Sequence, residues 1–211
     1  MSRPDTLLSH MSHNGVGANQ DKAEPDRKLL ESAATALAQN PRASMSAIAQ
    51  ACGIGRATLN RRFSSRQDLM RAIAMDAMNH LDEITKEASV ETSAQAFLRR
   101  ILPSLISLGD RFRVLDQDPE LLEVSEIQQA LERQRKESIA LSRSLKEENA
   151  LDHSVPDAFF AAALDGLLFS TWTAIADGHL APNDAPNLIF RTLFTGLGPE
   201  GNSGKGTLTR K

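Results

Sequence analysis

Hydrophobic residues recur at three- and four-residue intervals along most of the chain. The first such stripe consists of Leu29, Leu30, Ala33, Ala34 and Leu37. This is the period of one face of an α-helix, whereas a half-buried strand alternates at every second residue. Alternation of the strand type is not found over any useful length. The pattern therefore predicts an all-α protein of about nine helices.

The first two predicted helices have recognisable boundaries. Asp26 follows Pro25 and is a suitable N-cap, and Asn40-Pro41 ends the first helix because a residue before proline avoids the helical conformation. Ser44 is the predicted N-cap of the second helix, and Gly53 is its predicted end, where a left-handed backbone is inexpensive.

The next boundaries are also given by capping residues. A short third helix is predicted from Arg56 to Phe63. Ser65-Arg66-Gln67-Asp68 reads as a capping box that opens a long fourth helix. A fifth helix follows from about Ala94, bent or interrupted near Pro103, and Gly109-Asp110 is predicted to be a turn.

Capping residues also predict where the later helices start, but they leave open whether the stretch before Asn149 is one helix or two. Asp118-Pro119-Glu120 starts a mostly helical stretch to Asn149, which is one helix or two depending on the polar run Glu132–Ser138. Ser154-Val155-Pro156-Asp157 is a second capped start, before the most apolar helix of the chain. Gly178 and Pro182 mark a loop, after which Asn183 or Asp184 caps the last helix.

These elements suggest four parts. Residues 1–24 and 198–211 are polar or glycine-rich tails, although a helix at Thr6–Met11 is an alternative for the first. Residues 25–66 form a small N-terminal domain, and residues 67–197 form a larger helical domain.

Composition supports the helical fold and narrows the chemistry. The chain has no tyrosine and 4% aromatic residues, and its apolar mass is alanine and leucine, which favour helix. The N-terminus lacks a secretory signal, and about 18 consecutive apolar residues are nowhere found, so we expect a protein of the reducing cytosol that does not cross a membrane. The histidines His80, His153 and His179 are far apart, so neither a metal site nor another cofactor is expected, and no reactive constellation indicates an enzyme.

Cys52 is the single cysteine, which excludes an intrachain disulfide and a cysteine-based zinc cluster. Two interpretations remain. Its position on the inward side of the second helix favours a small buried hydrophobic residue over a redox sensor.

A strongly basic segment stands out in a chain whose net charge is −3. Residues 55–66 contain four arginines and no acidic residue. The segment includes the second of two short helices separated by Gly53-Ile54-Gly55, which is the layout of a helix-turn-helix. With Leu59 and Phe63 facing inward, the remaining side chains are available to double-stranded DNA: Arg56, Ala57, Thr58, Asn60, Arg61 and Arg62. The alternative is a merely solvated basic face.

The run SAIAQACGIGRATLNRRFSSRQDL resembles the DNA-binding domain of TetR-type transcriptional regulators. Three positions depart from the family pattern, since Asn60 stands where tyrosine is usual, Arg62 where histidine is common, and Gly55 in place of a serine cap. The resemblance implies that Ser46 contacts phosphate, that Arg56, Thr58, Asn60 and Arg61 face the groove, and that Arg62 and Arg66 hold the DNA backbone.

The resemblance also implies that residues 67–197 serve regulation and dimerisation. The homodimer it implies has as its core a four-helix bundle formed by the last two helices of each chain. The candidate interface residues are Phe160, Leu164, Leu167, Leu168, Thr171, Ile175, Leu188, Ile189 and Leu193. The alternative is that these helices only complete the chain's own core.

A small-molecule inducer is the third partner that the resemblance implies. Its candidate pocket is lined by Phe97, Ile101, Leu105, Phe112 and Trp172, although apolar residues at helical spacing also suit plain core. The resulting hypothesis is a dimeric repressor that an inducer releases from a near-palindromic operator. The alternative is a ligand-binding or scaffolding helical bundle that does not read DNA.

Overall fold

The structure is a computed structural model that describes residues 20–196. The predicted tails lie outside these residues, apart from residues 20–24, as does the alternative helix at Thr6–Met11. Helices form all the regular secondary structure of residues 20–196, which confirms the all-α prediction. They are α1 (Gln20–Gln39), α2 (Met45–Ala51), α3 (Arg56–Arg62), α4 (Arg66–Ala88), α5 (Ala94–Ser107), α6 (Gly109–Phe112), α7 (Val114–Gln117), the 3-10 helix η1 (Pro119–Glu123), α8 (Ser125–Glu147), α9 (Asp157–Ala176) and α10 (Ala185–Gly196).

The chain divides into two compact units. The first contains the residues up to Ser89 together with Ser107–Arg133, and the second contains Val90–Ile106 together with the residues from Gln134 onward. Helix α5 therefore belongs to the second unit, while α6, α7 and η1 belong to the first. This division follows packing and does not coincide with the predicted boundary after residue 66.

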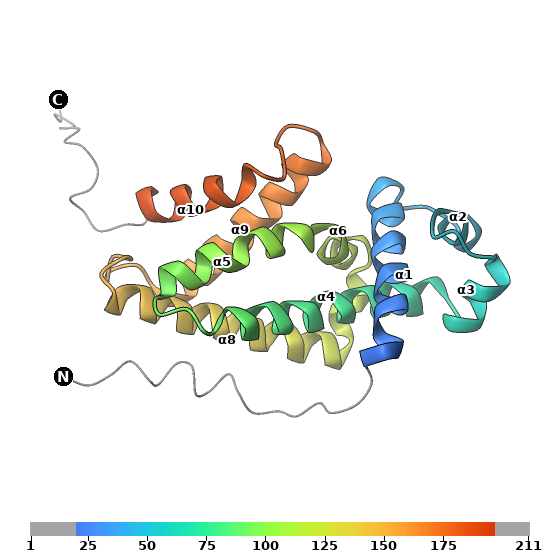
Figure 1. The fold of residues 1–211 in the computed structure, drawn as a ribbon, viewed down its shortest axis with the longest axis horizontal. Helices are drawn as coiled ribbons and strands as arrows, with labels where there is room; N and C mark the ends of the chain where they lie inside the picture. Colours follow the sequence, from blue (N-terminus) through green and yellow to red (C-terminus); the bar gives the residue numbers. More distant parts are fainter. Residues whose placement is uncertain (1–19, 197–211) are drawn as a thin grey trace. The chain divides into compact units, whose positions relative to one another are not determined.

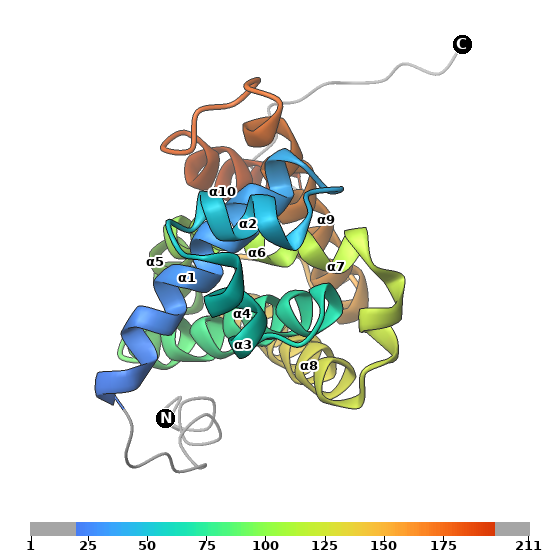
Figure 2. The same ribbon diagram turned by 90° about the vertical axis from the view of Figure 1, so that its right-hand side faces the viewer.

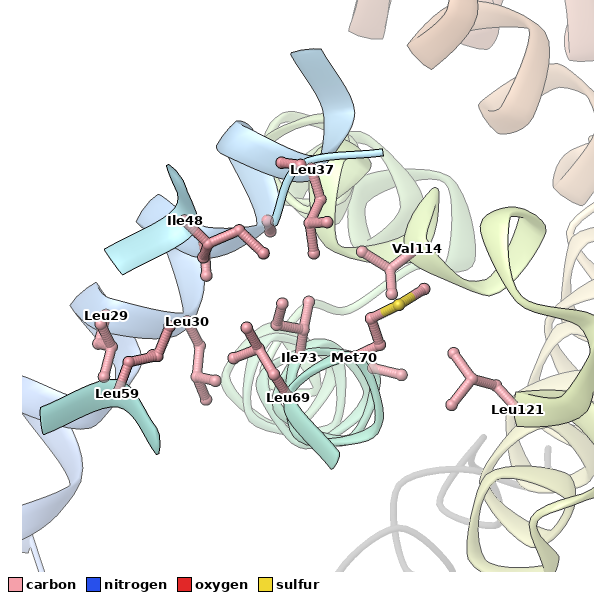
Figure 3. Close-up of a cluster of buried hydrophobic side chains, with 14 of the residues drawn as sticks. Leu29, Leu30, Leu37, Ile48, Leu59, Leu69, Met70, Ile73, Val114 and Leu121 are labelled. Atoms are coloured by element: carbon pink, nitrogen blue, oxygen red, sulfur yellow. The ribbon is translucent and has the colours of Figure 1, made fainter. Parts of the chain in front are cut away.

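The first unit is built around α1 and α4. Helix α1 contacts α2, α4 and α6, and α2 contacts α3, as Figures 1 and 2 show. The apolar stripe predicted for α1 faces inward and belongs to one buried cluster with side chains from α2, α3 and α4 (Figure 3). Ile48, Leu59 and Leu69 are fully buried in this cluster. Each such side chain contributes about 1.5–3 kcal/mol relative to exposure, so α2 and α3 are held by hydrophobic burial.

A network of charged side chains joins α1, α4 and α6 within this unit. The Arg111 guanidinium is buried and lies 2.6 Å from an Asp76 carboxylate oxygen and 3.5 Å from a Glu31 carboxylate oxygen. Its second terminal nitrogen lies 3.1 Å from Nδ1 of His80. Burial, and secondarily the Arg111 and Arg27 charges, lower the pKa of His80 below its ordinary value.

The second unit contains α5, α9, α10 and the C-terminal part of α8. Phe160 and Leu164 of α9 and Ile189 of α10 are buried in it. Asp157, the first residue of α9, accepts hydrogen bonds from Lys146, Ser142 and Arg143, and the Lys146 bond is the main reason that its pKa falls to about 2. These bonds attach the start of α9 to α8.

The predicted starts of α1 and α9 need correction. Helix α1 begins at Gln20, so Asp26 is inside it. Its first residues include good helix formers, and Pro25 lies close enough to the start to cost few backbone bonds. Helix α9 begins at Asp157, at the end of the predicted capped start, and Pro156 occupies the N-cap position. Ser154 lies two residues before this position, in a turn where its amide donates a hydrogen bond to the Asp152 carboxylate.

Three features of the middle of the chain also differ from, or complete, the predictions. Helix α5 continues through Pro103, whose exposed position leaves the unpaired carbonyl open to water. Gly109-Asp110 begins the short helix α6 instead of a turn, and Asp110 accepts a hydrogen bond from Thr35 at 2.9 Å. The polar run Glu132–Ser138 lies inside one continuous helix, α8, while Asp118 caps the separate helix η1.

Candidate nucleic-acid interface

The turn between α2 and α3 is set by local chemistry. The Ser44 hydroxyl accepts a hydrogen bond of 3.2 Å from the Ala47 amide, which confirms the predicted N-cap of α2. Gly53 has a φ of +68°, in the left-handed region that glycine adopts without strain. The Ile54 amide then bonds to the Ala49 carbonyl at 3.0 Å, so the chain leaves α2 sharply and enters α3 after Gly55.

Helix α3 has one inward and one outward side. Leu59 is fully buried and Phe63, just after the helix, is half-buried against the same core. On the other side, the side chains of Arg56, Ala57, Asn60, Arg61 and Arg62 are exposed, and Thr58 is half-buried. The structure therefore brings these six predicted DNA-contacting residues together on one short helix.

The outward side of α3 is positively charged. Residues 45–62 contain no acidic residue. Within the described residues, neither Arg56 nor Arg61 takes part in an ion pair or a side-chain hydrogen bond. Unpaired guanidinium groups retain their full charge for an anionic ligand, and duplex DNA presents a dense line of phosphates.

Arg66 is placed differently from the other arginines. It is the first residue of α4, is only partly exposed, and donates a hydrogen bond of 2.6 Å to the Pro41 carbonyl. A second terminal nitrogen lies 2.9 Å from the Met70 sulfur. The guanidinium thus connects the start of α4 to the turn between α1 and α2, a structural contact that its sequence neighbours did not reveal. The Ser65–Asp68 capping box beside it forms as predicted, with 3.0 Å from the Asp68 amide to the Ser65 hydroxyl.

Two further basic residues lie near this surface and were missed by sequence reasoning. Arg42 is exposed in the turn before α2, and Lys28 is exposed on α1. Lys28 and Arg62 line a pocket of about 220 Å³ together with Cys52. The sequence indicated only that these residues are basic. Lys28 reaches the surface of α2 and α3 because α1 packs against α2 in the folded chain. Ser46, predicted to contact phosphate, is exposed on the first turn of α2.

Cys52 is half-buried at the end of α2, with its sulfur 3.8 Å from the Leu29 carbonyl. Burial raises the pKa of the Cys52 thiol. A raised pKa lowers the thiolate fraction and therefore disfavours redox chemistry.

The candidate dimer residues are divided between two sides of α9 and α10. Leu167 and Ile175 are half-buried and Leu188 is exposed. The other six are buried within the chain's own second unit: Phe160, Leu164, Leu168, Thr171, Ile189 and Leu193. Because buried side chains have no surface to offer, the outward positions of these two helices are the ones available to a partner.

The candidate ligand residues are also divided. Ile101 and Leu105 are buried and Phe97 is half-buried on α5. The Trp172 indole donates a hydrogen bond of 3.2 Å to the Leu105 carbonyl, one of the last four of α5, which lack helical partners. Phe112 lies in the first unit, where it packs against the core cluster. Among residues 20–196, no group of three or more His, Cys, Asp or Glu side chains is arranged to hold a metal ion.

Comparison with known proteins gives a consistent result. Residues 29–73 match the family described as bacterial regulatory proteins, tetR family. The HTH-type transcriptional repressor LfrR of Mycolicibacterium smegmatis is 35% identical over 98 residues, which are 46% of this chain and 51% of that protein. The match thus spans about half the length of this curated relative.

Solved structures share the fold over most of the chain. The TetR-like regulator LfrR from Mycobacterium smegmatis in complex with proflavine has a TM-score of 0.68 at 24% identity, covering 83% of this chain and 97% of that one. AibR in complex with isovaleryl coenzyme A and operator DNA has a TM-score of 0.62 at 18% identity, covering 81% and 98%. At these identities the likeness establishes the fold.

Proposed function

We propose that this chain is a TetR-type protein and acts as a DNA-binding transcriptional regulator of the repressor type. The premise is the match of residues 29–73 to the tetR family. The observation that carries the proposal is α3, an exposed helix whose guanidinium groups at Arg56 and Arg61 have no acidic partner among the described residues. Asn60 lies between them in sequence and supplies the amide that can read a base edge.

Within this interface we distinguish residues that contact DNA directly from one that acts indirectly. Arg56, Arg61, Arg62 and Ser46 contact phosphates or base edges from α2 and α3, and Asn60 discriminates between bases. Arg66 acts indirectly, because its guanidinium already holds the Pro41 carbonyl and fixes the position of α4 relative to the turn before α2.

The regulator acts as a homodimer through α9 and α10. A two-fold dimer presents two copies of α3 about one DNA turn apart, roughly 34–36 Å, so the operator is near-palindromic. The relative LfrR carries the name of a repressor, and this supports the proposed sign of regulation.

A small molecule releases the repressor from its operator. The apolar side chains Phe97, Ile101, Leu105 and Trp172 of the second unit are the proposed contacts. Solved relatives in complex with proflavine and with isovaleryl coenzyme A support a ligand of this kind. The ligand must bind the DNA-free state more tightly than the DNA-bound state, since otherwise it shifts no equilibrium.

Binding to random-sequence duplex DNA tests the proposal directly. We expect a dissociation constant of about 10⁻⁴–10⁻⁶ M near physiological salt that tightens steeply at lower salt. Arg61→Ala is expected to reduce the slope of log K against log [salt] by about 0.9 for one lost phosphate contact. Fluorescence anisotropy across a salt series measures both quantities.

Arg133→Ala is the matched control for this experiment. Its side chain is 52% exposed on α8, away from α3, and pairs with Asp82 at 3.5 Å. It should leave the slope unchanged. Absence of binding at low salt would support the alternative, a helical bundle that does not read DNA.

Asn60→Ala separates base reading from phosphate contact. On an operator selected from genomic fragments, this change is expected to cost about 1–3 kcal/mol of discrimination, with little effect on random DNA. Arg62→Ala should weaken binding to both DNAs by the same factor. Competition binding with the two DNAs measures the ratio, and a uniform loss in Asn60→Ala would remove Asn60 from base reading.

A further inference from the structure

The outward side of α9 is charged at one position and, apart from that residue and the exposed Ser170, is apolar. Ala158, Ala162, Gly166 and Phe169 are exposed, and Phe159 is 56% exposed. These residues recur at helical spacing opposite the buried Phe160 and Leu164. Asp165 lies among them and is the single charged residue between Ala158 and Ala176.

The outward side of α10, which contacts α9 in the same unit (Figure 1), has the complementary composition. Leu188, Thr192 and Thr195 are exposed at helical spacing, with Arg191 among them. Arg191 is the single charged residue of α10. The two sides therefore carry one charge each, of opposite sign, on otherwise uncharged surface.

Neither charge is satisfied within the described part of the chain. Asp165 and Arg191 form no ion pair and no side-chain hydrogen bond with residues 27–196. Neighbouring atoms desolvate the Asp165 carboxyl and raise its pKa. An acid on an apolar face disfavours any apolar contact there unless the partner supplies a cation, because a buried unpaired charge is costly.

We propose that Asp165 of one copy pairs with Arg191 of a second copy across the α9–α10 faces, and that this pair fixes the register of the dimer. The inference rests on the dimer of the proposed function. Because a two-fold contact is isologous, the pair forms twice, and each copy contributes both an acid and a base. Phe159, Phe169 and Leu188 supply the surrounding apolar contact, and the two charge pairs select one alignment of the helices.

A second copy is favoured over a lipid bilayer as the occupant of this face. Helix α9 has 20 residues and is long and apolar enough to span a membrane by length and composition. However, its other side is packed within the chain through Phe160 and Leu164. A lone cation on the neighbouring helix matches the lone acid, whereas a bilayer core offers the acid no partner.

Charge reversal tests the pair. In a homodimer, Asp165→Arg sets the introduced guanidinium against the partner's Arg191, and Arg191→Asp sets the introduced carboxylate against the partner's Asp165. We expect each full-length variant alone to dimerise at least tenfold more weakly than the parent chain. An equimolar mixture of the two should form heterodimers, because both contacts then join groups of opposite charge. One contact joins the introduced arginine to the introduced aspartate, and the other joins the native Arg191 to the native Asp165. Light scattering after size exclusion, with one variant carrying a mass tag, measures these species.

The controls separate the possible outcomes. Glu87→Arg reverses an exposed charge on α4 and should leave the dimer intact, and circular dichroism verifies that all variants are folded. A parent chain that is monomeric at all concentrations overturns the dimer of the proposed function and the pair with it. A dimeric parent whose single variants also dimerise, or whose mixture forms no heterodimer, overturns the pair alone. Flotation of the parent chain with phosphatidylcholine–phosphatidylglycerol vesicles would assign the face to lipid and overturn the pair.

Discussion

Replacing Arg111 by methionine is expected to lower the free energy of unfolding by about 3 kcal/mol, the lower end of the range for breaking a buried ion pair. The side chain of Arg111 is 5% exposed, and its removal leaves Asp76 with Arg27, whose Nε lies 3.5 Å away, as its remaining cation. Urea denaturation followed by circular dichroism measures the change.

A matched variant distinguishes burial from simple loss of charge. Arg133→Met removes the exposed pair with Asp82, whose side chains are 52% and 41% exposed. Its cost should be at most about 1 kcal/mol. The double variant Asp76→Leu with Arg111→Met should lose less stability than the sum of the two single changes, because it leaves no uncompensated charge. Equal costs for Arg111→Met and Arg133→Met would mean that the buried network contributes no more than a surface pair.

The protonation of His80 gives an independent readout. Its pKa in the folded chain lies below 6.5, so the unfolded chain binds the proton more readily. Protonation of His80 therefore favours unfolding as the pH falls below about 6.5. Arg111→Met removes one of the cations that lower this pKa, so the His80 pKa should rise in an NMR titration. An unchanged pKa would contradict the contact between Arg111 and His80.

Replacing Phe160 by alanine should lower the free energy of unfolding by about 3–5 kcal/mol, because it leaves a cavity in the second unit. Phe160 is fully buried, whereas the adjacent Phe159 is 56% exposed. Phe159→Ala should therefore change unfolding of the monomer by less than about 0.5 kcal/mol. It should instead weaken self-association, which sedimentation equilibrium measures. If Phe159→Ala destabilised the monomer as much as Phe160→Ala, the assigned faces of α9 would be reversed.

This pair of phenylalanines also shows where sequence reasoning stops. Helix α9 is apolar around most of its circumference, so its periodicity indicates burial without indicating which side faces inward. Phe159 and Phe160 are equivalent by residue type, and only packing against the rest of the unit distinguishes them. The predicted interface therefore included residues that the chain buries by itself.

The helix-turn-helix was easier to predict because its determinants are local. Ser44, Gly53 and Ser65 each act on backbone groups within a few residues, and all three occupy the predicted positions. Contacts between distant residues had no such signal. Arg66 and Pro41 are 25 residues apart, and Arg111 and Asp76 are 35 apart. The pattern within a single helix predicts that such arginines are solvated, because their partners lie in distant parts of the sequence.

The proposed pairing of Asp165 on α9 with Arg191 on α10 has a consequence for cells that produce several regulators of one fold. Subunits with similar apolar faces can exchange into mixed assemblies, and a mixed assembly would join unlike recognition helices. A foreign subunit that lacks the matching charges would leave Asp165 and Arg191 buried without an ionic partner. The free energy of the mixed dimer would then be less favourable than that of the homodimer. The two charged side chains would in this way favour homodimers over mixed dimers with related regulators.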